Sequence, residues 1–174
     1  NIMTKILAAD IGGTKTLLQL SEFVAGQYQV LKEQRYASQD YASFDAVLTE
    51  FLNEAGQPTI NYVCFAIAGP VDVNGARANV TNLPWLLERD LLSKTYAINN
   101  LMLIHDFTAI AIGIDRLQDE ELLTLQQAQM QQRGNQLVIG AGTGLGVAQR
   151  IWNGHRYQVL ASEAGHADFS PADE

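Results

Sequence analysis

The sequence predicts an α/β fold with a mixed β-sheet, and three observations point to this class. The chain opens with three consecutive strand-like segments, which is the pattern of an antiparallel meander. Strand-like and helix-like segments then alternate, as they do around a parallel sheet. The chain has 174 residues, of which 47% are hydrophobic and 17% are charged, so it can bury a sizeable core.

The opening meander is predicted from apolar runs that are separated by glycine. Residues 5–9 form the first expected strand, and residues 15–20 form its hairpin partner across a Gly-Gly turn. Gly26 then breaks the chain, and residues 27–36 form the third strand. These three segments account for the antiparallel part of the expected sheet.

The alternating part begins with the most regular helical pattern in the chain. Between Ser43 and Gly56 the apolar residues recur every three or four positions, with Ser43 as the expected N-cap and Gly56 as the expected C-cap. A glutamine-rich stretch, residues 126–136, is interpreted as a partly helical surface connection. The other expected elements are strands over 62–68, 101–104 and 137–140, helices over 86–94 and 107–114, and a hairpin of 144–151 with 156–160 across Asn153-Gly154.

The excess of acidic residues limits the kinds of molecule that the protein is expected to bind. Nineteen Asp and Glu residues against eleven Lys and Arg residues give a formal net charge of −8, which opposes non-specific binding to nucleic acid or to an anionic membrane. The apolar runs are strand-sized and no leader-like segment opens the chain, so a cytosolic small-molecule enzyme is expected. The single cysteine, Cys64, lies in an apolar run and is expected to be a buried small hydrophobe.

Two glycine-rich loops carry the clearest chemical signal. Asp10 ends an apolar run and is separated by Ile11 from the turn of Gly12, Gly13 and Thr14. A strand-end carboxylate beside such a turn is placed to hold Mg²⁺ through water. Glycine lets the backbone approach an anion and aim consecutive N–H groups at it. A second loop follows another apolar run, so a nucleotide held between two lobes is expected. The residues expected to hold it are Asp10, Gly12, Gly13, Thr14, Gly140, Gly142, Thr143 and Gly144.

Each loop has a competing interpretation. The first loop also fits a tight turn between hairpin strands. The second loop superficially matches the dinucleotide fingerprint G-x-G-x-x-G, but Leu145 stands where that fingerprint requires a small residue. The residues that follow, 147–152, indicate a strand where the fingerprint requires a helix. A dinucleotide site is therefore disfavoured.

Two further groups of residues are candidates for the reacting centre. Asp106 lies where an expected strand gives way to a helix, at the edge where open α/β folds bind ligands. It suits a general base, and it equally suits a helix N-cap. Glu163 and His166 flank a glycine turn, and a carboxylate beside an imidazole suits sugar hydroxyls, which both donate and accept.

Taken together in chain order, these motifs resemble those of bacterial glucokinases of the hexokinase and actin-like ATPase superfamily. The motifs are the Asp10 turn, Asn82-Leu-Pro-Trp85, His105-Asp-Phe-Thr-Ala109, the second glycine loop, and Glu163-Ala-Gly-His-Ala-Asp-Phe169. The resemblance implies an actin-like ATPase (RNase H-like) small lobe over residues 1–112, with the first phosphate loop and the catalytic aspartate. Residues 113–174 would open the large lobe, with the second phosphate loop and the sugar-binding motif.

The resemblance also implies an activity and a set of site residues. The activity is phosphorylation of glucose at its 6-hydroxyl to glucose 6-phosphate, with ATP and Mg²⁺, in a cytoplasmic enzyme that can form a homodimer. Asp106 would be the base. His105 departs from the family, which usually has Asn at this position. The alternative is that His105 occupies a partly buried strand end and binds no ligand. The implied sugar-binding residues are Asn82, His105, Asp106, Glu163 and His166.

The resemblance has limits and alternatives. Family members are roughly twice this long, so the chain is expected to be an amino-terminal part that does not phosphorylate glucose by itself. A ROK-like kinase for another hexose, or a non-catalytic sugar-responsive regulator, is the alternative. Residues 167–172 lack the cysteine-rich zinc motif of ROK proteins, and the sequence contains no basic helix-turn-helix segment. Both observations favour the glucokinase group.

Overall fold

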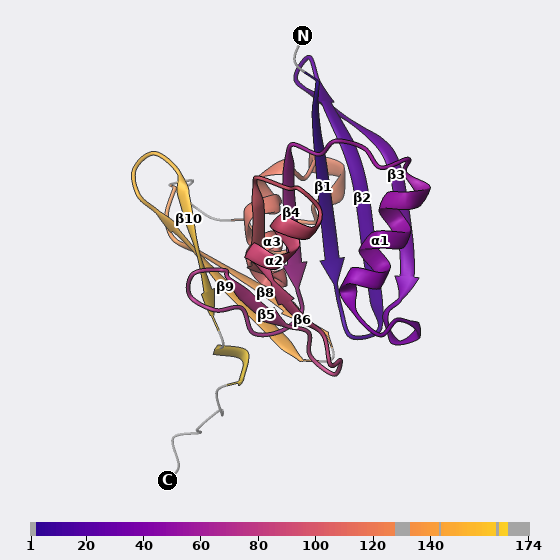
Figure 1. Ribbon diagram of the computed structural model, residues 1–174. Helices are drawn as coiled ribbons and strands as arrows, with labels where there is room; N and C mark the ends of the chain where they lie inside the picture. The colour runs from indigo at the N-terminus through magenta and orange to yellow at the C-terminus, as the bar shows by residue number, and fades with distance from the viewer. Residues whose placement is uncertain (1–2, 128–132, 143, 163, 167–174) are drawn as a thin grey trace. The chain divides into compact units, whose positions relative to one another are not determined.

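A five-stranded mixed sheet forms the centre of the first part of the chain (Figure 1). The computed structural model describes residues 3–127, 133–142, 144–162 and 164–166. The strand order is β3-β2-β1-β4-β7; the first three strands pair antiparallel, and β4 and β7 run parallel to β1. The strands are β1 (Thr4–Ile11), β2 (Lys15–Val24), β3 (Gln27–Ala37), β4 (Tyr62–Ile67) and β7 (Leu101–His105). The predicted mixed sheet is confirmed.

Helix α1 (Phe44–Glu54) packs on one face of this sheet, over its antiparallel strands (Figure 1). The Ser43 side chain accepts a hydrogen bond from the Ala46 backbone N–H, as expected of an N-cap. The expected C-cap was wrong by one residue: Ala55 caps the helix, and Gly56 follows it with a φ of +78°, a conformation that glycine adopts without strain. The buried face of the helix consists of Phe44, Val47, Leu48, Phe51 and Leu52.

The core lies between this helix and one face of the sheet. In β1, Leu7, Ala9 and Ile11 are buried while the residues between them face the other side, because side chains alternate along a strand. The ring of Trp85 lies 6.3 Å from that of Phe44, between ring centroids. Asp10 therefore belongs to the face of the sheet opposite this core.

The segment expected as one helix over 86–94 is a strand followed by a helix. Strand β6 (Leu86–Glu88) pairs antiparallel with β5 (Arg77–Asn79), and α2 (Arg89–Thr95) begins only after it. The cross-strand ion pair between Arg77 Nε and Glu88 Oε1 measures 2.9 Å, and Leu87 is buried opposite Ala78. Tertiary pairing thus outweighs the helical spacing of this segment.

The second part of the chain contains a three-stranded antiparallel sheet in the order β10-β9-β8. Its strands are β8 (Gln136–Ala141), β9 (Leu145–Trp152) and β10 (Tyr157–Ser162), so the predicted strand and hairpin are confirmed. Asn153 Oδ1 accepts hydrogen bonds from the backbone N–H groups of His155 and Arg156 and so closes the hairpin loop. The glutamine-rich stretch lies partly outside the described residues.

A buried arginine anchors the second sheet to the segment that precedes it. Arg150 in β9 is only 2% exposed, and its guanidinium pairs with Asp115, donates to Gln136 Oε1 and lies 4.1 Å from the centroid of the Tyr157 ring. Asp115 belongs to a short 3-10 turn (Ile114–Arg116) after helix α3 (Asp106–Gly113). A carboxylate and a ring together stabilise this charge away from water.

The chain divides into two compact units, Asn1–Asp106 and Phe107–Glu174. The sequence placed the division near Gly113, whereas the contacts divide where α3 begins. Within the described part of the chain, none of the helices is both long and apolar enough to span a membrane. Cys64 in β4 is half-buried, less than expected, and burial raises the pKa of its thiol.

Candidate active site

The parallel strands of the first sheet bring the predicted carboxylates to one edge. Strands β1, β4 and β7 run in the same direction, so their carboxyl ends meet. Asp10 pairs in register with Ala66, and Ile67 pairs with His105, the residue before Asp106. Residues nearly a hundred positions apart in the sequence therefore lie at the same edge.

The two carboxylates at this edge influence one another. Although Asp10 retains exposed surface, neighbouring atoms partly desolvate its carboxyl group and raise its pKa, and the negative charge of Asp106 raises that pKa further. A divalent cation would relieve this repulsion, and carboxylate oxygens suit Mg²⁺. Among the described residues, no three His, Cys, Asp or Glu side chains cluster as a ligand set, so Mg²⁺ held here would take its other ligands from water or phosphate.

We expect Asp10→Asn to raise the melting temperature of the magnesium-free protein at pH 7 by roughly 1–3 °C. A raised pKa stabilises the fold only while the carboxyl group is protonated, so the ionised Asp10 opposes folding at neutral pH. The difference should fade as the pH falls toward the ordinary value of 3.8, where the wild-type group also becomes neutral. Thermal melts between pH 7 and pH 4 measure this difference, and a variant that melts lower at pH 7 would contradict it.

Asp106 is held by its neighbour in the sequence. His105 Nδ1 lies 2.9 Å from Asp106 Oδ1, a distance at which the N–H donates a hydrogen bond to the carboxylate. The side chains of the two residues are 20% and 29% exposed, so both are shielded yet reachable from solvent. Asp106 is also the first residue of α3, so it lies inside the first turn of the helix and not at the N-cap position that the alternative interpretation gave it.

The first glycine turn connects β1 and β2, and a residue of the short 3-10 turn (Ser38–Asp40) that follows β3 stabilises it. The Gly12 backbone N–H donates to Lys15 O, and Ser38 Oγ donates to Gly12 O at 2.7 Å. Ser38 is fully buried and also bonds the Thr16 hydroxyl at 2.9 Å. Ser38 is not predictable from the sequence, because a serine after the third strand carries no local signal for a turn far earlier in the chain.

Asn82 lies beside this glycine turn, on a loop that is tied to the end of β4. The Thr81 backbone N–H donates to Ala68 O at 3.0 Å, and Asn82 adopts a φ of +65°. A Cβ atom added to Gly13 would lie 2.6 Å from Thr81 O, so only glycine fits against this loop without a shift. The first unit thus gathers Asp10, the glycine turn, Asn82, His105 and Asp106 at one edge of its sheet.

The second glycine loop closes the hairpin of β8 and β9. Gly142 and Gly144 lie in the turn, where the Gly142 N–H donates to Gly144 O at 2.8 Å. Thr143 lies outside the described residues. Gly140 lies within β8 and pairs in register with Gly146 of β9, so it is part of the strand that leads to the turn.

The segment predicted to bind the sugar is described only over residues 164–166, which come after the same sheet. A short 3-10 turn (Ala164–His166) follows β10, and a Cβ atom on Gly165 would overlap the Leu145 carbonyl group, so this turn packs on the residue after the second glycine loop. Glu163 lies outside the described residues, as does the side chain of His166. The structure thus brings the backbone of residues 164–166 to the second glycine loop.

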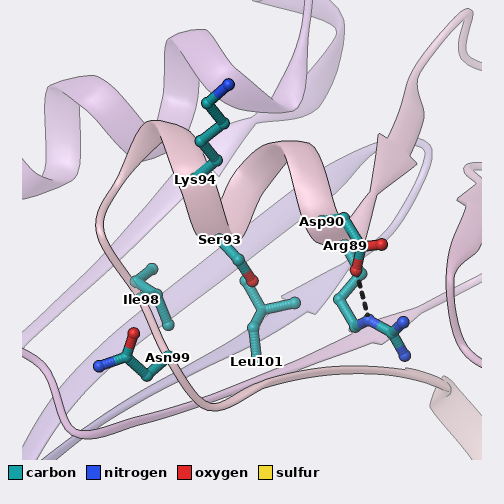
Figure 2. A pocket seen from close by; sticks show the side chains of 7 residues that line it. All are labelled: Arg89, Asp90, Ser93, Lys94, Ile98, Asn99 and Leu101. Atoms are coloured by element: carbon teal, nitrogen blue, oxygen red, sulfur yellow. Dashed lines mark hydrogen bonds and ion pairs between the residues drawn. The ribbon is translucent and has the colours of Figure 1, made fainter.

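A polar hollow of about 470 Å³ lies elsewhere in the first unit (Figure 2). Leu101, at its edge, is the first residue of β7, whereas His105 is the last, so the hollow lies at the opposite end of that strand from the carboxylates. Arg89 pairs with Asp90 there at 3.0 Å. Its lining residues are Arg89, Asp90, Ser93, Lys94, Ile98, Asn99 and Leu101.

Comparisons with known proteins extend over almost the whole chain. The family model described as Glucokinase matches residues 7–174. The glucokinase of Nostoc punctiforme is 43% identical over 173 residues, which are 99% of this chain and 50% of that protein. The glucokinase of Synechocystis is also 43% identical, over 95% of this chain and 49% of that protein. The chain spans about half the length of these curated relatives.

A solved structure extends the likeness to the fold. The crystal structure of a glucokinase from an Antarctic psychrotroph superposes with a TM-score of 0.82 at 26% identity, covering 98% of this chain and 53% of that one. The glucokinase of Balamuthia mandrillaris, solved in complex with glucose, gives 0.72 at 22% identity, covering 98% and 51%. The second likeness bears on the fold alone.

Proposed function

This chain belongs to the glucokinase family, and from this premise we propose that the full-length protein transfers the γ-phosphoryl group of ATP to the 6-hydroxyl of glucose. The product is glucose 6-phosphate. The observation that carries the proposal is the pair of carboxylates, Asp10 and Asp106, at the edge of the sheet beside the Gly12-Gly13 turn. Phosphoryl transfer needs a base and a charge-neutralising site beside a phosphate-binding turn, and this edge provides the residue types for both.

Asp106 is the proposed general base. It accepts the proton of the sugar hydroxyl as that oxygen attacks the γ-phosphorus, and the bond from phosphorus to the bridging oxygen of ADP breaks. His105 Nδ1 contacts one carboxylate oxygen, Oδ1, and we assign the other oxygen to the proton of the sugar hydroxyl. Most of the catalysis comes from holding these atoms in line.

Asp10 is the proposed residue for Mg²⁺, which it would hold through water. When bound, the ion would offset the negative charge of the phosphates. The raised pKa of Asp10 supports this role. Partial desolvation and the negative charge of Asp106 both disfavour the ionised carboxylate, and a bound cation would offset both effects. We assign the phosphates of ATP to the backbone of the two glycine turns, with Gly12, Gly13 and Thr14 in the first turn.

The second turn contributes Gly142, Thr143 and Gly144 to this proposal, and Gly140 belongs to the strand that positions them. The sugar is assigned to Asn82, His105 and Asp106 from the first unit and to Glu163 and His166 from the second. A coupled kinase assay on the full-length protein with a panel of hexoses tests the proposal. Glucose should give the highest kcat/KM; a preference for another hexose would favour the ROK-like alternative, and no turnover would favour a regulator.

His105 is the position at which a different sugar preference would arise. We expect His105→Asn to lower the KM for glucose and to change kcat less, because a planar amide can both donate to and accept from sugar hydroxyls. Steady-state kinetics with glucose and with mannose measure the effect. A glucose KM that stays the same or rises would show that His105 serves the fold or another hexose.

A further inference from the structure

The residue after the proposed base packs on two glycines of the second sheet. Phe107 follows Asp106 directly, and its ring lies against Gly140 of β8 and Gly146 of β9. Gly140 and Gly146 pair directly across the two strands, so at this position of the ladder neither β8 nor β9 has a side chain. The ring therefore lies on bare backbone.

The fit leaves no room for a side chain at either glycine. A Cβ atom added to Gly146 would overlap three atoms of the Phe107 ring, and one added to Gly140 would overlap its Cζ atom. Neither glycine needs a positive φ, so their conformation alone does not require glycine. The requirement for glycine at these positions comes from the aromatic ring.

The same glycines flank the second phosphate turn. Ala141 and Leu145 form the last pair of the β8–β9 ladder, and residues 142–144 form the turn beyond it. Helix α3, which begins with Asp106, has a second attachment after its other end, where Asp115 pairs with the buried Arg150 of β9. Strand β9 thus holds the start of this helix through Phe107 and the turn after it through Asp115.

We propose that Phe107 is a positioning residue for phosphoryl transfer: its ring packs on Gly140 and Gly146 and so holds the peptide bond that joins it to Asp106, the proposed base. The inference rests on the proposed kinase function. Asp106 and Phe107 share a planar peptide bond, so a displaced ring moves the backbone of the base. Misplacement by a fraction of an ångström affects the transition state more than it affects binding of the sugar.

Substitutions in the full-length protein test the contact from both sides. We expect Gly146→Ala and Phe107→Ala each to lower kcat about tenfold, with the glucose KM changed less than about twofold. Because both substitutions remove the same contact, the kcat of the double variant should be no more than about twofold lower than that of Phe107→Ala. Full additivity of the two losses in kcat would overturn the proposal.

A background without the base separates positioning from general loss of structure. In Asp106→Asn, Phe107→Ala should change the residual kcat by less than about twofold, because there is no base left to position. A further tenfold loss in that background would assign Phe107 a purely structural role. Gly113→Ala is the matched control, because Gly113 has a φ of −72° and no atom within 4 Å of an added Cβ, and its kcat should equal that of wild type.

The outcomes distinguish this inference from the proposed function. If the wild-type protein does not phosphorylate any hexose, the proposed function fails, and thermal melts of Gly146→Ala, Phe107→Ala and the double variant still test the contact through their coupling. If wild type turns over glucose and Gly146→Ala keeps its full kcat, the positioning role fails while the kinase assignment stands. Melts of all variants identify any that do not fold.

Discussion

Replacing Asp106 with asparagine in the full-length protein should lower kcat about 10²-fold or more, which is the usual scale of a lost general base. The amide has the size and shape of the carboxylate, and its oxygen can still accept the hydrogen bond from His105 Nδ1. The site therefore keeps its geometry and loses the group that takes the proton. Steady-state kinetics give kcat, and titration of the variant with glucose should show that binding largely survives.

A second carboxylate in the first unit provides the control for this experiment. Asp90 in α2 has a side chain that is 86% exposed and pairs with Arg89, well away from the edge that holds Asp106. Asp90→Asn removes the same charge and should leave kcat unchanged. Near-wild-type turnover by Asp106→Asn would remove this residue from the proposed mechanism.

Gly13→Ala should lower kcat/KM for ATP about 10²-fold, because phosphate-binding backbone that moves by about 1 Å loses its alignment with the transferring group. The added Cβ would lie 2.6 Å from Thr81 O, a backbone atom that cannot turn aside as a flexible side chain can. The turn, the Asn82 loop or both must therefore move. Initial rates over a range of ATP concentrations measure the loss.

Gly134→Ala is the matched substitution for Gly13→Ala. An added Cβ at Gly134 meets no atom within 4 Å, so this variant should behave as wild type. Thermal melts of both variants would show whether the change at Gly13 also affects stability. A Gly13→Ala enzyme with an unchanged KM for ATP and an unchanged kcat would mean that this turn does not hold the phosphates.

The elements that the sequence predicts well are those with strong local patterns. The apolar run of β1, the helical spacing after Ser43 and the Asn153-Gly154 hairpin each follow from residues that are neighbours in the chain. The edge that holds Asp10 and Asp106 was also predictable, because parallel strands end together. Local periodicity and one topological rule therefore account for the sheet and for the position of Asp106, whereas its role as the base is proposed from the resemblance to glucokinases.

The features that the sequence does not predict depend on distant partners. Residues 86–88 form a strand that pairs with residues 77–79, and the Arg77–Glu88 ion pair links the two strands. The helical spacing of the apolar residues over 86–94 gives no sign of this pairing. Ser38 braces a turn that lies 26 positions earlier. The sequence does not distinguish a glycine that faces phosphate from a glycine that packs under an aromatic ring. The packing of Phe107 on Gly140 and Gly146 is therefore visible only in the structure.

The wide sequence separation of Asp10 and Asp106 has a consequence for how the chain acquires its fold during synthesis. The hairpins of β1, β2 and β3 are local, so they can form as soon as these residues leave the ribosome. Strand β7 can dock only after β4 and α2 have been made, which delays the approach of the two carboxylates until the first sheet is nearly complete. The nascent meander thus folds free of their mutual repulsion, which arises only with the final strand.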